Sequence, residues 1–165
     1  MSFCVRRILI ACAVAAAIPS VALAQVRLTV GAGAGIAGST DGSLSEGRTA
    51  PVVTGQLTAM KAVIGVGAQV DAWRDGASSI ALATGHLEFR LPSTPLFLTL
   101  GAGFGRGDPD GKGTISGTAG HLGAACDIGR AVAPRVLTLF GNAFLVYAPT
   151  RSLQMVDGGL AITWR

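Results

Sequence analysis

The stretch that decides the fold runs from Asp157 to Arg165 and reads DGGLAITWR. Large apolar and small residues alternate along it, so an extended strand would carry Leu160, Ile162 and Trp164 on one face and Gly159, Ala161 and Thr163 on the other. This alternation predicts a strand at the end of the sequence. Taken alone, the stretch fits an edge strand of a soluble β-sandwich equally well.

The N-terminal residues favour export from the cytoplasm. Residues 1–24 carry two arginines, an apolar run, a proline and a small-residue end, in the order Arg6, Arg7, Ile8 to Ile18, Pro19 and Ala22-Leu23-Ala24. This order is typical of a cleaved secretory signal peptide. A membrane anchor is the weaker alternative, because Pro19 interrupts the run. We therefore expect secretion across the inner membrane, removal of residues 1–24, and one domain over residues 25–165.

The expected mature chain is nearly neutral. The full sequence has 13 basic and 9 acidic residues; without Arg6 and Arg7, 13 − 2 = 11 basic residues remain and the net charge is 11 − 9 = +2. The charges are scattered and no basic run interleaves with aromatic residues, so no nucleic-acid partner is expected. Cys126 is the one cysteine left after the signal peptide, so an intramolecular disulfide is excluded.

Alternation with a period of two continues through the chain, with glycine throughout. No apolar stretch after residue 24 approaches the roughly 18 to 20 residues that a spanning helix needs. The pattern predicts eight strands, over residues 26–36, 52–59, 64–72, 80–91, 96–105, 114–126, 136–147 and 153–165. The expected connections include a long loop at 38–49, a loop at 73–79, a proline turn at 92–95 and a connection at 127–134.

The strand over residues 114–126 has the weakest pattern. No single register places both Ile115 and Leu122 on its apolar face. A β-bulge within this strand would resolve the conflict.

Eight strands of about 10 residues would each cross a bilayer when tilted about 45°. A β-structure can span lipid only as a closed barrel, because every backbone donor and acceptor needs a partner inside the protein. The apolar faces would then contact lipid, and the interior would hold a polar network of Arg27, Gln69, Asp71, His86, Glu88, Arg90 and Asn142. Glycines would also point inward and make room for the long charged side chains, namely Gly31, Gly33, Gly101 and Gly103.

Over residues 25–165 the chain resembles the small eight-stranded bacterial outer-membrane β-barrels, the OmpX type and the membrane half of OmpA. The resemblance rests on the signal peptide, the alternating strands and the closing strand. It departs from the family where Arg165 follows the terminal aromatic residue and in its low aromatic content. It implies an all-β, closed antiparallel eight-stranded transmembrane β-barrel in the cell outer membrane.

The same resemblance implies partners. These are outer-membrane lipid, with periplasmic chaperones and the barrel-assembly machinery during biogenesis. Residues of the closing strand would then act as the assembly signal, namely Gly159, Ile162 and Trp164.

One group of residues deserves a catalytic hypothesis. His86, Glu88 and Arg90 share a strand face, and residues 114–126 include Ser116, Thr118 and His121. Some outer-membrane barrels are lipid A hydrolases with a serine, a histidine and an acid, and such a site needs the hydroxyl within hydrogen-bond reach of the base. No motif supports that geometry here, so we favour an interior salt-bridge network, and we expect no catalytic, cofactor or metal site.

The sequence therefore favours an outer-membrane barrel with a structural or surface-interaction role. General porin activity is disfavoured, because side chains fill the interior of an eight-stranded barrel. The alternatives are an outer-membrane lipid A-modifying enzyme and a soluble periplasmic lipocalin-like binding barrel. The lipocalin-like barrel would need its apolar face inside and its charges outside. No ligand is identified by the sequence.

Overall fold

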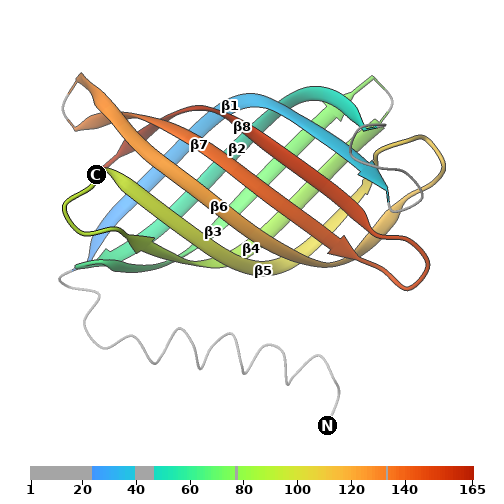
Figure 1. Ribbon diagram of the computed structural model, residues 1–165, viewed down its shortest axis with the longest axis horizontal. Coiled ribbons are helices and arrows are strands. Elements are labelled where there is room, and N and C mark those ends of the chain that lie inside the picture. The colour runs from blue at the N-terminus through green and yellow to red at the C-terminus, as the bar shows by residue number, and fades with distance from the viewer. Residues whose placement is uncertain (1–23, 40–46, 77, 133) are drawn as a thin grey trace, which may run out of the picture.

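The computed structural model describes residues 24–39, 47–76, 78–132 and 134–165. The expected signal peptide and the centre of the loop at 38–49 lie outside these residues. Eight antiparallel strands form one closed barrel (Figure 1): β1 (Gln25–Ser39), β2 (Arg48–Lys61), β3 (Ile64–Asp75), β4 (Ser78–Arg90), β5 (Leu96–Asp108), β6 (Ile115–Val132), β7 (Arg135–Tyr147) and β8 (Leu153–Trp164). No helix in the described part of the chain is long and apolar enough to cross a membrane.

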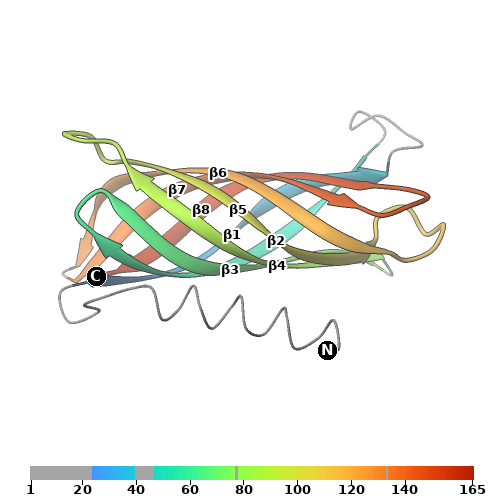
Figure 2. The ribbon, with the colours of Figure 1, turned by 90° about the horizontal axis from the view of Figure 1, so that it is seen from below.

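The closing strand pairs with the first, as predicted from its sequence. Trp164 lies opposite Leu28 at one end of the seam, and Leu153 lies opposite Ser39 at the other. The paired residues around the barrel can be followed from Val26 through one complete circuit to Ile36 on the same strand, by way of Ala59, Val66, Leu87, Leu100, Leu122, Ala143 and Val156. One circuit around the sheet therefore ends 36 − 26 = 10 residues farther along β1. This displacement, the stagger of the closed sheet, accompanies the strand inclination seen in Figures 1 and 2.

The two ends of the barrel differ in what they carry. Because the number of strands is even, the start of β1 and the end of β8 lie at the same end, which we call the termini end. The connections β2–β3, β4–β5 and β6–β7 also lie there. The opposite end, which we call the loop end, carries the connections β1–β2, β3–β4, β5–β6 and β7–β8.

The outer wall of the barrel is apolar. Large side chains remain exposed along every strand; Val30, Leu100 and Phe104, for example, are 47%, 56% and 57% exposed. Soluble monomers rarely expose contiguous apolar surface of this extent. Buried charged residues such as Arg27 and Glu88 lie inside. The wall is thus the reverse of the arrangement that a soluble lipocalin-like barrel requires, and this contradicts that alternative.

The interior is not polar throughout, which corrects the expectation that large apolar residues face outward. Near the loop end, the interior is packed with apolar side chains, namely Ala37, Ala50, Val52, Trp73, Ile80, Leu82, Ile115, Ala119, Phe144, Val146, Leu153 and Met155. Both faces of these strand segments are apolar, so alternation of polar and apolar residues could not mark which face is inside. Packing, rather than polarity, fills this part of the barrel.

The strands span 12 to 18 residues, and all except β8 are longer than expected. The predicted loop at 73–79 is wrong, because β3 continues to Asp75 and β4 begins at Ser78. Trp73 continues the inward positions of β3, and its indole Nε1 donates a hydrogen bond to the Gly35 carbonyl at 3.0 Å. The connection that remains between the two strands begins at Gly76, which has a φ of 55° that glycine adopts readily.

Strand β6 also differs from the prediction. Ile115 faces inward, with 4% exposure, and Leu122 faces outward, with 61% exposure, so the two residues need no common face. Pairing is regular from Thr118 to Asp127, and the register shifts occur later, between Asp127 and Val132. The predicted connection at 127–134 is therefore mostly strand. The irregularity lies at the termini end rather than within residues 114–126.

The inward glycines serve close packing. A Cβ atom on Gly31 would lie 2.8 Å from the Phe140 ring, and one on Gly101 would lie 3.0 Å from the Cβ of His86. A Cβ on Gly33 or Gly103 would collide with a backbone carbonyl of the neighbouring strand. The space thus accommodates an aromatic ring, an imidazole and the adjacent backbone, and not the long charged side chains that the sequence suggested.

Candidate functional site

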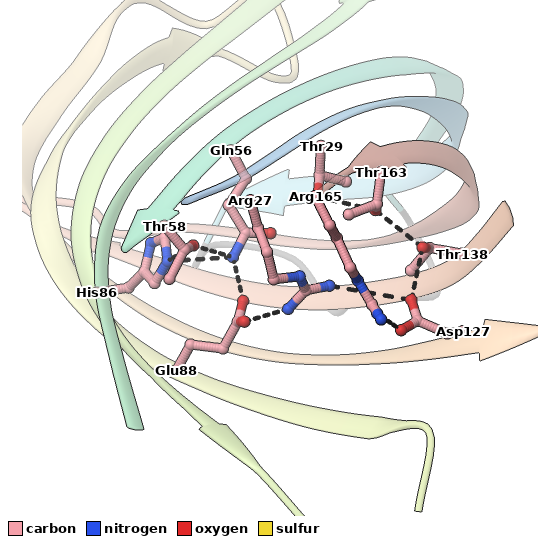
Figure 3. A network of polar contacts seen from close by, with 10 residues as sticks. All are labelled: Arg27, Thr29, Gln56, Thr58, His86, Glu88, Asp127, Thr138, Thr163 and Arg165. Atoms are coloured by element: carbon pink, nitrogen blue, oxygen red, sulfur yellow. Dashed lines mark hydrogen bonds and ion pairs between the residues drawn. The ribbon is translucent and has the colours of Figure 1, made fainter. Parts of the chain in front are cut away.

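A charged cluster fills the interior near the termini end, and Figure 3 shows its residues together. Arg27 Nη1 on β1 forms a hydrogen-bonded ion pair with Glu88 Oε1 on β4, and both side chains are at most 5% exposed. Arg27 Nη2 lies 3.9 Å from Asp127 Oδ1, and Arg165 pairs with the other oxygen of Asp127. Two arginines and two carboxylates therefore balance one another inside the wall, as buried charges require.

An aromatic ring lies beneath both cations. The guanidinium carbon of Arg27 is 3.8 Å from the centroid of the Phe97 ring, and that of Arg165 is 5.7 Å from the same centroid. The negative face of an aromatic ring attracts such cations. Phe97 thus adds cation–π contacts to the ion pairs of the cluster.

Neutral side chains extend the cluster toward β2. Gln56 Nε2 donates to Glu88 Oε2 at 2.7 Å and lies 3.1 Å from His86 Nε2, and Thr58 Oγ1 lies 3.0 Å from the same imidazole nitrogen. His86 is therefore bonded to an amide and a hydroxyl, and it has no acidic partner in these contacts. Figure 3 shows the imidazole beside Thr58 and Gln56.

A row of threonines crosses the closing seam. Thr29 on β1 and Thr163 on β8 are 3.0 Å apart, and Thr163 and Thr138 on β7 are 2.9 Å apart. Thr138 then donates to Asp127 Oδ1 on β6 at 2.9 Å. This row connects four strands to the charged cluster through hydroxyl groups.

A second polar group lies farther toward the loop end. Gln69 donates to Asp71 at 3.0 Å, and Asn142 Nδ2 donates to Asp157 Oδ1 at 2.9 Å. His121 Nε2 lies 3.2 Å from Asn142 Oδ1. The His121 ring also stacks on Phe144, with centroids 4.6 Å apart. These contacts form the boundary between the polar and the apolar parts of the interior.

Six of the seven residues expected in the interior network are buried there: Arg27, Gln69, Asp71, His86, Glu88 and Asn142. Arg90 is exposed at the end of β4, although its position in the alternation points inward, because the strand ends there. Sequence reasoning did not place Gln56, Thr58, Asp127, Asp157 and Arg165 in the network. For Gln56, Thr58 and Asp157 the sequence did hold a signal, because alternate residues of a strand share a face and these three occupy inward positions.

The residues of the catalytic hypothesis are divided between the two faces of the wall. His86 and His121 point inward and are 4% and 3% exposed, whereas Ser116 and Thr118 are exposed on the outer face of β6. A serine outside the wall cannot transfer its proton to an imidazole inside it. The geometry therefore gives the hydrolase alternative no assembled nucleophile and base among these residues.

The acidic turn between β5 and β6 uses its carboxylates within the protein. Asp108 Oδ1 accepts a hydrogen bond from the Gly111 amide at 2.7 Å, and Asp110 Oδ2 accepts one from Arg151 Nη2 at 2.6 Å. In the part of the chain that the structure describes, no group of three or more histidine, cysteine, aspartate or glutamate residues could hold a metal ion.

A small cavity, of about 20 Å³, lies among the polar residues of the interior, and its lining includes Arg27, Gln69, Glu88, Phe97 and Asn142. A volume of this size holds about one water molecule. Above it, toward the loop end, lies the packed apolar cluster.

Comparison with known proteins gives a fold and no close relative. No family model matches the chain, and no curated protein sequence matches it. Neisserial surface protein A matches in structure with a TM-score of 0.61 at 13% identity, covering 86% of this chain and 97% of that one. Ail, the attachment invasion locus protein of Yersinia pestis, solved with the heparin analogue sucrose octasulfate, matches with a TM-score of 0.58 at 13% identity, covering 86% and 99%.

A second structure of Ail matches with a TM-score of 0.55 at 13% identity, covering 84% of this chain and 97% of that one. At such identities the likeness establishes the fold. The chain has the fold of the small eight-stranded outer-membrane β-barrels. This conclusion rests on the number of strands, the closure of the sheet, the outward orientation of the apolar side chains and the likeness to these neighbours.

Proposed function

We propose that the protein is an outer-membrane barrel with a structural or surface-interaction role. The observation that carries this proposal is an apolar wall around the whole circumference that encloses a filled interior. In water such a wall would promote aggregation, whereas in a bilayer it contacts acyl chains. Strands of 12 to 18 residues exceed the roughly 9 to 11 that a tilted spanning strand needs, so they extend beyond the lipid.

The orientation follows from the even number of strands. Outer-membrane barrels of this kind keep both chain ends on the periplasmic side. The termini end would then face the periplasm and the loop end the exterior. Export would use residues 1–24 as a signal peptide, and assembly would use the closing strand with Gly159, Ile162 and Trp164.

The filled interior disfavours a role as a general porin. The polar part holds a cavity of about 20 Å³, and the apolar cluster closes the loop end. Nutrients and ions of ordinary size would need to displace paired charges and packed side chains.

The structural neighbours support the surface-interaction part of the proposal. One is described as a surface protein, and the other as an attachment and invasion protein that was solved with a sulfated sugar. In this chain the loop end carries ion pairs, such as Arg48 with Asp75 between the ends of β2 and β3 at 3.7 Å, and Arg151 with Asp110 between two connections at 2.6 Å. These pairs would hold the outer surface in a defined shape for a partner.

Cell fractionation tests the proposed location. The folded protein should be found in the detergent-extracted outer membrane and should migrate differently on gels before and after boiling. Recovery in the soluble periplasmic fraction would contradict the proposal. In planar bilayers the purified barrel should show no stable porin-sized conductance, and a large, reproducible conductance would contradict the filled interior.

A further inference from the structure

Two grooves join on the outer wall over β1 to β5. The first, about 600 Å³, is lined in part by Gly55, Ala72, Ala81, Ala83 and Arg106. The second, about 550 Å³, lies nearer the loop end, and its lining includes Arg74, Ser79, Arg106 and Thr114. Because Arg106 lines both, the two grooves form one continuous depression, which we call the Arg74–Arg106 groove.

The depression arises on β4, where the large apolar side chains face inward and the small ones face outward. Ile80 and Leu82 point inward and are 2% and 3% exposed, so the outward positions of the same segment are Ala81 and Ala83. Ala81 lies opposite Ala72 on β3, and the two side chains together form a shallow floor. Larger side chains rise beside this floor, among them Val70 and Phe104.

Two cations lie at the loop-end side of the groove. Arg74 and Arg106 are exposed on the outer face, near the ends of β3 and β5. Among the described residues neither arginine forms an ion pair, and the hydrogen bond from Arg74 Nε to the Gly76 carbonyl is long, at 3.5 Å. Asp108 also lines the groove, and its Oδ1 accepts a hydrogen bond from the Gly111 amide.

An arginine on the outer wall of a membrane barrel is costly unless it lies at the interface or meets an anion. Phe104 and Tyr147 are 57% and 67% exposed on the same wall, close to the loop end, where aromatic residues mark the interface. Arg74 and Arg106 therefore lie at the level of lipid head groups. Guanidinium groups bind phosphate through paired, charge-assisted hydrogen bonds.

We propose that the Arg74–Arg106 groove binds a phosphate-bearing lipid of the outer leaflet. One acyl chain lies on the floor of Gly55, Ala72, Ala81 and Ala83, and the phosphate contacts the two guanidinium groups. The proposal rests on the proposed function, which places the loop end at the outer leaflet. An apolar depression that ends in two cations matches an amphiphile, whereas free phosphate would leave the apolar part empty.

Native mass spectrometry of the folded barrel in detergent tests the head-group contact. Wild-type protein and the variant Arg74→Gln/Arg106→Gln are titrated with purified lipid A and with the same lipid after removal of its phosphates. We expect the double variant to bind lipid A at least roughly tenfold more weakly. Wild-type protein should show a similar loss with the phosphate-free lipid, and inorganic phosphate alone should not compete at equal concentration.

Matched variants separate this site from general charge and surface effects. Arg135→Gln removes the same charge at the termini end and should bind as wild type, and Arg106→Lys should retain most of the affinity. Ala83→Phe fills the floor and should weaken binding, whereas Ala143→Phe, on the outer face of β7, should not.

Each variant is compared at equal amounts of the folded form that shifts on boiling. Unchanged binding by the double variant, equal binding of the phosphate-free lipid, or no effect of Ala83→Phe would each overturn the inference. Absence of the wild-type protein from the outer membrane would contradict the proposed function instead. A barrel that resides in the outer membrane but does not discriminate between the two lipids would contradict only the lipid site.

Discussion

Arg27 on β1 and Glu88 on β4 form an ion pair inside the barrel, although 61 residues separate them in the chain. The two strands are not neighbours in the sheet, so the pair spans the lumen. Gln56 donates to the second oxygen of Glu88 at 2.7 Å, and the Phe97 ring lies 3.8 Å from the guanidinium carbon of Arg27. The pair therefore ties opposite parts of the wall together.

Removing one charge of this pair should be costly. Glu88→Gln leaves the buried Arg27 charge without its closest counterion, so we expect a loss of about 3 kcal/mol in the free energy of unfolding. The double variant Arg27→Met/Glu88→Gln should lose less than the sum of the two single losses, because no isolated charge remains. Urea unfolding in detergent measures all three values.

Arg90→Gln is the matched control for this cycle. Arg90 is also an arginine near Glu88 in sequence, but it is exposed at the end of β4. Its replacement should change the free energy of unfolding by no more than about 0.5 kcal/mol. Additive losses for Arg27 and Glu88, or a large loss for Arg90→Gln, would contradict the assigned pairing.

The last residue of the sequence should contribute to stability. Arg165 departs from the usual closing pattern, but it pairs with Asp127 and lies 5.7 Å from the Phe97 ring centroid. Arg165→Gln should lower the free energy of unfolding by about 1 kcal/mol, since the side chain is partly exposed. Arg135→Gln, at the same end on the outer face, should have a smaller effect. Equal effects of the two variants would indicate that the interior pair contributes nothing.

Trp73 should be more sensitive to a small change than an outward aromatic residue. Its side chain is 1% exposed, and Nε1 donates to the Gly35 carbonyl at 3.0 Å. Trp73→Phe removes this donor and part of the ring, and we expect a loss of about 2 kcal/mol. Tyr147→Phe, at a residue that is 67% exposed, should cost little. Similar melting temperatures for wild type and Trp73→Phe would contradict the packed loop-end interior.

Sequence alone could predict the number of strands, their order and most of the outer wall. Alternation was decisive where polar and apolar residues share a strand, as on β1, where Arg27 and Thr29 face inward and Leu28 and Val30 outward. It failed where both faces are apolar. In Ile80-Ala81-Leu82-Ala83 only the difference in size separates the two faces, and the larger residues lie inside.

The sequence could predict which residues of the candidate site face the interior, but not which of them contact one another. The alternation of inward and outward positions along each strand places Arg27 and Glu88 inside. It does not say which residues meet across the lumen, because this depends on the ten-residue stagger of the closed sheet. The same stagger brings Asp127 and Arg165 into the cluster. Arg90 shows a second limit of the alternation. Its position in the strand predicts an inward side chain, but Arg90 is the last residue of β4 and is exposed.

The end of β1 and two connections meet at the loop end through Asp110. Its Oδ2 accepts hydrogen bonds from Ser39 Oγ at 3.0 Å and from Arg151 Nη2 at 2.6 Å, and its Oδ1 accepts one from the Lys112 amide at 3.2 Å. Ser39 ends β1, Asp110 lies between β5 and β6, and Arg151 lies between β7 and β8. Partial burial raises the pKa of Asp110, but these hydrogen bonds and the charges of Arg151 and Lys112 outweigh it and lower the pKa below the ordinary 3.8.

This lowered pKa predicts how the loop-end contact depends on pH. Because the folded state favours the carboxylate, its contribution is fully present above the ordinary aspartate pKa and is lost as the pH falls below about 4 through the folded pKa. Asp110→Asn should therefore lower the free energy of unfolding at pH 7 by about 1 kcal/mol or less, the range for a partly exposed ion pair. The difference from wild type should shrink below pH 4, as measured by urea unfolding in detergent at several pH values. Asp75→Asn, which alters the more exposed pair with Arg48, should show a smaller difference at pH 7, and a difference for Asp110→Asn that persists unchanged at low pH would contradict a role for its charge.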